Sequence, residues 1–381
     1  MSVLILVLWT SSGLGILYLA LAGLMVGRLA RRTLSEAAEA PSVTMLKPLH
    51  GAEPGLLENL LSFVRQDYPG PVQIVLGVQR SDDPAVAVAR ELQRACPGRD
   101  IVLAIDARLH GSNRKVSNLI NMAEAARNDV VVLADSDMRV VPDYLSRLVA
   151  ELGRPGVGAV TCPYHGVPRE NGWSRLAALA LGSHFLPGVA MGVGLGLGHP
   201  CMGSTIALRR DTLERIGGFR ILADELADDH ELGARVRSLG FQVAVTPFTV
   251  GHVCAERSFA ELVAQELRWQ RTIRQVAPAG HLGSVVAHPL AFALLALLIQ
   301  PGPLPAALVA AAIAARIGVC LAVERAFGVK AHPYGLVPAR DLLSFALFVA
   351  SFLGRGVSWR GYRYEAAPGG ALLPKARPDP L

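Results

Sequence analysis

The sequence is poor in aromatic residues, in charges and in clustered cysteines. Of its 381 residues, 6% are aromatic and 18% are charged, and none of the five cysteines forms a C-x-x-C pair. Structural zinc sites and the disulfide frameworks of small secreted domains both need closely spaced cysteines. The absence of such spacing argues against both kinds of site and suits a reducing compartment.

Three motifs for metals or nucleotides begin in the sequence but are incomplete. The segment HELGA (230–234) starts like a zinc-protease helix but has Ala234 where the second histidine would stand. The loop HGSNRKVSNL (110–119) lacks the G-K-[ST] of a Walker loop, and GVGLGLG (192–198) follows no predicted strand of a βαβ unit. A metalloprotease, a P-loop and a Rossmann dinucleotide site are therefore not predicted.

The charges that are present point to a membrane surface. Basic residues are dispersed and are not interleaved with aromatics, so no nucleic-acid partner is expected. The net charge of +6 and the pI of ≈ 9.3 suit a protein that faces anionic phospholipid. Hydrophobic residues make up 51% of the chain and mean hydropathy is +0.37, which is high for a purely soluble protein.

The first hydrophobic segment lies at the N-terminus. Residues 3–27 carry no charge, and as a helix they are long enough to cross about 30 Å of hydrocarbon. The basic residues Arg28, Arg31 and Arg32 follow this segment rather than precede it, which favours an uncleaved anchor over a signal peptide. By the positive-inside rule, the following domain lies in the cytoplasm.

More apolar sequence gathers near the C-terminus. Residues 285–300 and 304–323 are separated by Pro301-Gly302-Pro303, as in a tight helical hairpin. A third stretch, 341–354, is too short to span unless it extends toward Trp359, and otherwise it lies in the interface or folds back. We expect four regions: an anchor and basic linker (1–40), a soluble domain (41–280), membrane helices (281–364) and a loose Pro/Gly-rich tail (365–381).

The soluble domain alternates short apolar runs with helical patterns. This alternation predicts an α/β fold with a parallel sheet covered by helices on both faces. In open sheets of this kind, ligands bind beyond the carboxyl ends of the strands. The predicted strands are 43–46, 72–78, 101–105 and 130–134.

The last of these strands ends in two carboxylates, Asp135 and Asp137. Oxygen ligands so close together suit a hard divalent cation such as Mg²⁺ or Mn²⁺, which commonly sits between carboxylates and substrate phosphates. Such a cation would stabilise a diphosphate leaving group. The alternative is that one aspartate caps the helix that begins near Pro142, although Asp143 could fill that role.

Three further groups of residues suit the same chemistry. Arg114 and Lys115 open a helix, where an anion such as phosphate is favoured, although a plain solvated loop is equally consistent. Asp228, Asp229 and Glu231 open another helix, either to offset its dipole or to provide a general base.

The third group is QELRWQR (265–271), which places Gln265, Arg268 and Trp269 on adjacent helical faces. Arginine can bind phosphate oxygens in bidentate fashion, and tryptophan can stack on a sugar. A solvated amphipathic helix is the alternative reading.

Together these motifs resemble the membrane-anchored glycosyltransferases of family 2 and of family 21, the ceramide glucosyltransferases. The resemblance implies a GT-A fold, of the Rossmann-like nucleotide-diphospho-sugar transferase type, with N- and C-terminal transmembrane helices and a UDP-sugar donor. It covers most of the chain from Met45 to Tyr364. The segments that carry it are 46–69, 78–85, 114–119, 135–145, 203–219, 226–233, 265–269 and 358–364.

The resemblance also implies residue roles. Asp83 matches the first family aspartate, near the nucleotide, and Asp135 matches the second, at the diphosphate and metal site, with Asp137 completing the D-x-D. Asp229 matches the third, the expected catalytic base. In the same way Arg114, Lys115 and Asn118 are expected to bind the nucleotide-sugar. Gln265, Arg268 and Trp269 match the Q-x-x-R-W motif that closes over donor and acceptor, and His184 stands where ceramide enzymes also carry a histidine.

Within this group, the segments LKPLHGAEPGL, GSNRKVSNLINM and RPGVGAVTCPYHG are most similar to bacterial hopanoid biosynthesis-associated glycosyltransferases. This implies an inner-membrane enzyme with a cytoplasmic catalytic domain that moves N-acetylglucosamine from a UDP-sugar to bacteriohopanetetrol. The alternatives are a ceramide glucosyltransferase that uses UDP-glucose and a catalytically silent membrane scaffold. A processive polysaccharide synthase would need more spanning helices. Arg80 and His230 depart from the residues usual in relatives.

Overall fold

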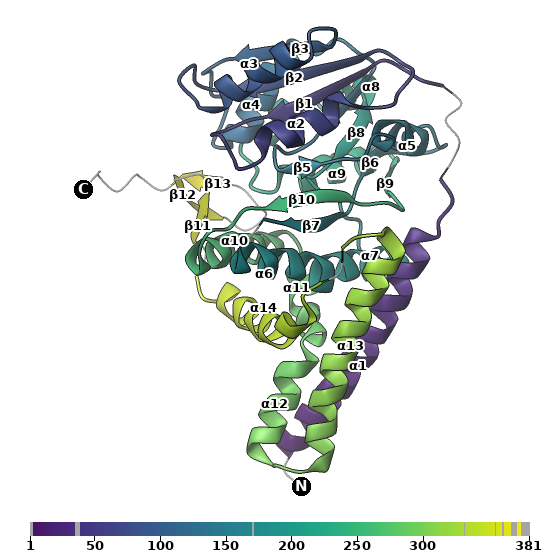
Figure 1. Cartoon of the computed structure of the whole chain (residues 1–381), viewed down its shortest axis with the longest axis vertical. Helices are drawn as coiled ribbons and strands as arrows, with labels where there is room; N and C mark the ends of the chain where they lie inside the picture. The colour runs from purple at the N-terminus through teal and green to yellow at the C-terminus, as the bar shows by residue number, and fades with distance from the viewer. Residues whose placement is uncertain are drawn as a thin grey trace, which may run out of the picture.

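The computed structural model describes residues 3–34, 39–169, 171–330, 332–354, 356–359, 362–366 and 372–374. Figure 1 shows an α/β domain at one end and a group of long helices at the other, with a layer of helices lying crosswise between them. The N-terminus lies at the far tip of the long helices.

The main sheet has seven strands in the order β3-β2-β1-β4-β8-β6-β9. The first four run parallel, as the βα alternation predicts, but β8 runs antiparallel to both β4 and β6. The chain enters β8 at the edge of the sheet where the parallel strands end, and β8 therefore runs in the opposite direction to them. The strands are β1 (Val43–Pro48), β2 (Val72–Val78), β3 (Asp100–Ile105), β4 (Val130–Leu133), β6 (Val157–Thr161), β8 (Ile206–Arg209) and β9 (Gln242–Val245).

Helices cover both faces of this sheet, and alternate strand residues separate the two cores. On β1, Val43 and Met45 pack into one core while Leu46 packs into the other, because successive strand side chains point to opposite faces. The first core is completed by α2 (Leu56–Val64), α3 (Ala85–Ala95) and α5 (Tyr144–Leu152). The second is completed by α4 (Arg114–Ala123), α8 (Arg210–Arg215), the 3-10 turn η2 (Phe219–Leu222) and α9 (Asp228–Ser238).

A smaller three-stranded sheet lies between the main sheet and the crosswise helices (Figure 1). Its central strand β10 pairs antiparallel with β5, which follows the D-x-D, and parallel with β7. The strands are β5 (Met138–Arg139), β7 (Tyr164–Pro168) and β10 (Val250–Cys254). The crosswise helices are α6 (Gly172–Ala180), α10 (Phe259–Val276), α11 (Pro278–Gly283) and α14 (Val337–Ser351).

Within the described residues, four helical segments are long and apolar enough to cross a membrane: Val3–Ala30, Gly172–Gly194, Pro303–Phe327 and Tyr334–Ser351. The bent pair Pro278–Ala287 and Pro289–Ile299 would add a fifth. The anchor α1 (Val3–Ala30) runs beside α12 (Pro289–Ile299) and α13 (Pro303–Phe327), and these two form the predicted hairpin around the Pro-Gly-Pro turn.

The apolar segment 173–198 forms α6, the π-helical turn η1 (Leu181–Phe185) and α7 (Leu186–Gly194). It satisfies the length and composition of a span, yet α6 lies crosswise and the segment is half buried in the protein. Short 3-10 turns η3 (Ser284–Ala287) and η4 (Tyr334–Leu336) precede α12 and α14.

The C-terminal part forms a third, antiparallel sheet of β11 (Gly356–Trp359), β12 (Tyr362–Ala366) and β13 (Leu372–Pro374). Strand β13 falls within the range expected as a loose tail. Residues 367–371 and 375–381 lie outside the described residues, as do Arg360 and Gly361 of the segment 358–364.

Candidate active site

Lys115 lies at the centre of a cluster drawn from distant parts of the sequence. Its Nζ is 2.9 Å from Asp135 Oδ1 and 3.3 Å from Asp228 Oδ2. Asp229 Oδ2 accepts a hydrogen bond of 2.8 Å from the backbone N–H of Gly203. The start of α4, the end of β4 and the start of α9 thus meet beside the loop that enters β8.

The backbone of Gly203 lies close to three charged side chains of this cluster. A Cβ at this position would come within 3.2 Å of Asp135 Oδ2, 3.3 Å of Lys115 Nζ and 3.5 Å of Asp229 Oδ2. The backbone of residue 203 therefore borders all three charged groups at once. Gly203 begins the segment 203–219 that carries the family resemblance, but no role for this glycine was predicted from the sequence.

The cluster holds more negative than positive charge. Burial lowers the pKa of Lys115, but the carboxylates of Asp135, Asp228 and Asp229 outweigh it and raise that pKa above its ordinary value, so the ammonium stays charged. Burial raises the pKa values of Asp228 and Asp229, and Lys115 only partly opposes this. A carboxyl whose pKa is raised toward neutrality is better suited to take a proton.

Asp83 lies at the carboxyl end of β2, two strands from Asp135. Its Oδ1 accepts hydrogen bonds of 2.8 Å from the backbone N–H groups of Gly51 and Ala85, and its Oδ2 is 3.3 Å from His50 Nδ1. Only 7% of the side chain is exposed. The carboxylate thus fixes the loop after β1 against the start of α3, and its predicted contact with a nucleotide stays a prediction.

Asp137 faces a different set of groups from Asp135. Its Oδ2 is 3.6 Å from His252 Nδ1 on β10, and its Oδ1 is buried without a hydrogen-bond partner among the described residues. The His252 ring packs against Trp269, with centroids 5.9 Å apart, and against Tyr164, at 5.5 Å. His252 therefore links the D-x-D to the Q-x-x-R-W helix.

Tyr164 lies close to the acidic cluster. Burial first, and then the carboxylates of Asp229, Asp137 and Asp135, raise the pKa of its hydroxyl, so this group stays protonated. Neither His252 nor Tyr164 was predicted, because each stands on a short strand whose pairing the sequence does not reveal.

The remaining residues of the Q-x-x-R-W motif contact each other. Arg268 Nη2 donates a hydrogen bond of 3.1 Å to Gln265 Oε1. The intervening Glu266 is bound at both oxygens by Arg340 of α14, at 2.7 and 2.8 Å. The motif helix α10 is thus fixed to a candidate membrane helix.

Of the residues predicted on α4, Lys115 lies in the acidic cluster, whereas Asn118 makes a contact that holds the helix against the sheet. Asn118 is buried, and its Nδ2 donates a hydrogen bond of 2.8 Å to the carbonyl of Gly77. This bond connects α4 to β2. The carbonyl of Arg114 accepts from Gln79, and Asn113 caps the helix by accepting from the N–H of Val116. The predicted binding roles of Arg114 and Asn118 stay predictions.

Lys47 is a second buried cation at the site and was not predicted. Its Nζ donates to the backbone carbonyl of Asp135 and lies 3.6 Å from the centre of the Phe63 ring. Burial lowers the pKa of Lys47 to about 7, although Asp135 and Asp137 oppose the shift. This lysine supports the backbone of the D-x-D at its first residue, Asp135.

The site suits a divalent cation that draws part of its ligands from a substrate. No group of three or more His, Cys, Asp or Glu side chains among the described residues could hold a metal ion by itself. Asp135 and Asp137 offer two carboxylates, and Asp137 Oδ1 is buried with no hydrogen-bond partner among the described residues. Two carboxylates completed by phosphate oxygens and water are a common arrangement for Mg²⁺.

The mixed sheet, with its acidic pair at the end of β4, defines a GT-A glycosyltransferase fold. One solved structure with this fold is a mannosyltransferase from Pyrobaculum calidifontis in complex with GDP-Man and Mn²⁺. It is 19% identical, has a TM-score of 0.50, and aligns with 92% of this chain and 98% of its own.

The sequence pattern of glycosyl transferase family 21 matches residues 7–372, and the chain belongs to this family. It is 25% identical over 211 residues to ceramide glucosyltransferase 1 of Caenorhabditis elegans, across 54% of this chain and 44% of that protein. It is 23% identical over 240 residues to an N-acetylglucosaminyltransferase of Sinorhizobium fredii, across 61% and 57%. The chain spans about half the length of these curated relatives.

Proposed function

We propose that the protein transfers a sugar, with inversion, from a UDP-sugar to a hydroxyl of a membrane lipid. The best candidate for the sugar is N-acetylglucosamine and for the lipid bacteriohopanetetrol, with the catalytic domain on the cytoplasmic side of the bacterial inner membrane. The observation that carries the proposal is the meeting of Lys115, Asp135 and Asp229 around Gly203, above helices suited to a membrane.

The donor diphosphate would bind at Lys115 and the N-terminus of α4, where an ammonium and backbone N–H groups favour an anion. Asp135 and Asp137 would hold the divalent cation, which supplies positive charge to the leaving diphosphate. The Pyrobaculum mannosyltransferase, which shares this fold, is in complex with GDP-Man and Mn²⁺, and this supports a divalent cation in the proposed reaction.

The carboxylate of Asp229 acts as the general base in this proposal. It takes the proton of the lipid hydroxyl while the hydroxyl oxygen forms its bond to the anomeric carbon. The bond from that carbon to the diphosphate oxygen breaks with its electron pair, and the charge on UDP is offset at Lys115. The raised pKa of Asp229 fits this role, because a base with a pKa closer to the working pH accepts a proton more effectively.

The lipid acceptor would approach from the crosswise helices. Trp269 of α10 packs against His252, so that the motif helix reaches from the acidic site into the helical layer. An acceptor anchored in the bilayer would present its polar end to that layer.

A second candidate, ceramide glucosylation with UDP-glucose, is favoured by several ceramide glucosyltransferases among the similar sequences. The N-acetylglucosaminyltransferases of Sinorhizobium fredii and Bradyrhizobium diazoefficiens favour the first.

The test is transfer by membranes that contain the protein. Labelled UDP-N-acetylglucosamine or UDP-glucose is incubated with each lipid, and the products are weighed by mass spectrometry. The proposal expects a hopanoid that has gained one N-acetylhexosamine. A glucosylated ceramide would support the second candidate instead. Binding of UDP with no transfer to any lipid would make the protein a silent scaffold.

A further inference from the structure

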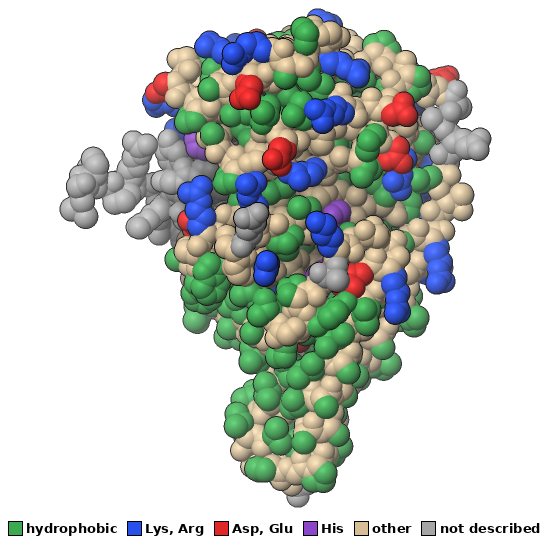
Figure 2. Space-filling model, viewed as in Figure 1, with side chains coloured by type: hydrophobic (Ala, Val, Ile, Leu, Met, Phe, Trp, Pro, Cys, Tyr) green, Lys and Arg blue, Asp and Glu red, His purple; other side chains and the backbone are tan. Residues whose placement is uncertain are grey.

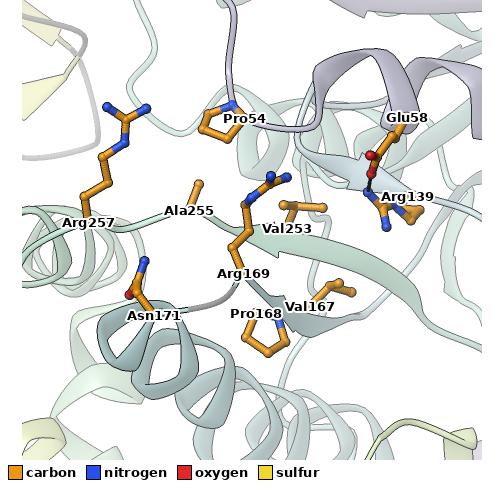
Figure 3. Close-up of a pocket in the computed structure, with 10 residues that line it drawn as sticks. All are labelled: Pro54, Glu58, Arg139, Val167, Pro168, Arg169, Asn171, Val253, Ala255 and Arg257. Carbon is orange, nitrogen blue, oxygen red and sulfur yellow. Dashed lines mark hydrogen bonds and ion pairs between the residues drawn. The ribbon is translucent and has the colours of Figure 1, made fainter.

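A pocket lined by arginines lies outside the acidic site. Its volume is about 530 Å³, and its walls include Arg139, Arg169 and Arg257 with Glu58 as the one acidic side chain. Among the described residues that line it, three guanidinium groups and one carboxylate sum to a formal charge of +2. Figure 3 shows Arg169 between the other two arginines, pointing toward the start of α2.

Two of these arginines have no acidic partner within the described residues. Arg139 binds Glu58 at 2.8 Å and Asn59 at 3.2 Å. Neither Arg169 nor Arg257 forms a side-chain hydrogen bond or ion pair with any residue that the structure describes. Within the described part of the chain, the pocket therefore has two guanidinium groups without a paired carboxylate, although the Glu261 carboxylate accepts a hydrogen bond of 2.8 Å from the backbone N–H of Arg257.

Two of the three guanidinium groups, those of Arg169 and Arg139, lie close to the same backbone position, with the Glu58 carboxylate 3.9 Å from a Cβ placed there and Arg257 farther away. A Cβ at Gly55, which has a φ of 81°, would come within 2.7 Å of Arg169 Nη1 and 3.8 Å of Arg139 Nη2. Gly55 begins helix α2, whose free N–H groups add to the positive potential. Cations gathered in this way favour an anion with several oxygens, and a phosphate group fits the planar donors of arginine.

The pocket lies on the opposite face of the small sheet from the acceptor-side residues. Strand residues alternate between faces, and β5, β7 and β10 are paired in register. Arg139 pairs with Gly251 and Val167 with Val253 on one face, whereas His252 stands on the other. The pocket is therefore separate from the proposed transfer site.

An exposed aromatic pair stands beside the pocket. Trp173, two residues after the pocket residue Asn171, is 37% exposed, and Phe259, two residues after Arg257, is 49% exposed. Their ring centroids are 5.4 Å apart. Tryptophan side chains such as that of Trp173 are enriched where a membrane meets water. Figure 2 shows Lys and Arg side chains, with some Asp and Glu among them, on the upper half of the molecule and a mainly hydrophobic lower half.

We propose that the pocket binds the phosphate of an anionic phospholipid headgroup in the leaflet that faces the α/β domain. The unneutralised arginines would hold the phosphate, and Trp173 and Phe259 would rest among the lipid headgroups. Such a lipid would secure the starts of α6 and α10, the helices that carry the aromatic pair. The assignment depends on the membrane location of the helices and does not require sugar transfer.

The test measures lipid binding by the purified full-length protein in neutral detergent. Native mass spectrometry compares phosphatidylglycerol with phosphatidylcholine, with Arg169→Gln and Arg257→Gln as variants. Arg175→Gln is the matched control, since Arg175 is exposed on α6 and does not line the pocket. We expect each pocket variant to weaken phosphatidylglycerol binding about fivefold and the control less than about twofold.

Three outcomes would overturn the assignment. Equal binding of the two lipids would show that the pocket does not select for negative charge. Equal losses in Arg175→Gln and the pocket variants would show a diffuse surface effect. If inorganic phosphate at the lipid's own concentration displaced phosphatidylglycerol, the pocket would be a site for free anions. A melting temperature unchanged in each variant ensures that the losses do not reflect unfolding.

Discussion

Two buried clusters of charge lie in different layers of this protein, and they are built in opposite ways. In the acidic site, Lys115 faces the carboxylates of Asp135, Asp228 and Asp229, and Asp135 is 35% exposed. In the helical layer, Asp341 of α14 is paired with Arg316 of α13 at 2.7 Å and with His184 at 3.1 Å.

The difference distinguishes a cluster suited to binding a substrate, around Lys115, from a cluster that stabilises helix packing, around Arg316. The first cluster has one ammonium, that of Lys115, facing three carboxylates, and Asp135 is partly exposed, so an additional cation and a phosphate could be accommodated there. The second is closed: Arg316 also donates to the carbonyls of Ser183 and Ala287, and its side chain is 1% exposed. Buried ion pairs of this kind fix how segments pack. His184 therefore belongs with the packing of η1, α13 and α14 and not with the acidic site.

The largest expected effect is on turnover in Asp229→Asn. Loss of a general base should lower kcat by about 10²- to 10⁴-fold and change UDP-sugar binding little. Turnover and donor affinity are measured separately, by product formation and by calorimetry. Glu231→Gln is the control, since Glu231 stands on the same helix turn and pairs with Arg235 near the surface. Full turnover in Asp229→Asn would remove this residue as the base.

The matching change in the closed cluster is Arg316→Met. Removal of one partner from a buried pair should lower the free energy of unfolding by about 3–5 kcal/mol, because Asp341 loses its guanidinium partner and keeps only the imidazole of His184. Thermal unfolding in detergent measures the loss. In Arg235→Gln, which breaks a more exposed pair, the expected loss is below about 1 kcal/mol. Equal stability of the two variants would contradict the distinction between the clusters.

Gly203→Ala tests how closely the backbone borders the acidic site. The added methyl would stand within 3.2 to 3.5 Å of three charged groups, so one of them must move by a few tenths of an ångström. We expect kcat/KM to fall about tenfold, since small misplacements at a reacting centre are costly, while the melting temperature changes little. Wild-type kinetics in this variant would mean that the site tolerates the displacement.

The smallest expected effect is on the pH dependence of activity: the decrease in rate at low pH (the acid limb) should occur at a higher pH than an ordinary aspartate would give. Asp229 must be ionised to accept a proton, and burial raises its pKa above the ordinary value for aspartate. Activity should therefore fall as the pH decreases through a pKa above about 3.9. Initial rates measured across pH at saturating Mn²⁺ give this limb. An acid limb at or below the ordinary value would show that the site does not hold Asp229 as described.

The candidate site residues that could be found from the sequence are those at the ends of helices and strands. Asp135, Lys115 and Asp229 stand at the end of a strand or the start of a helix, and such ends meet at one edge of an α/β sheet. The antiparallel strand β8 was not predicted, because single-sequence patterns do not reveal strand direction. His252 and Lys47 were missed for a similar reason: each stands within a strand that reads as buried and structural.

The central claim is that Asp135 holds a cation that binds the donor diphosphate. Calorimetric titration of UDP into the full-length protein, with and without Mn²⁺, tests it in the wild type and in Asp135→Ala. The wild type should bind UDP markedly more tightly with Mn²⁺, and the variant should lose that gain. An Asp135→Ala protein whose UDP affinity still responds to Mn²⁺ like the wild type would contradict the account.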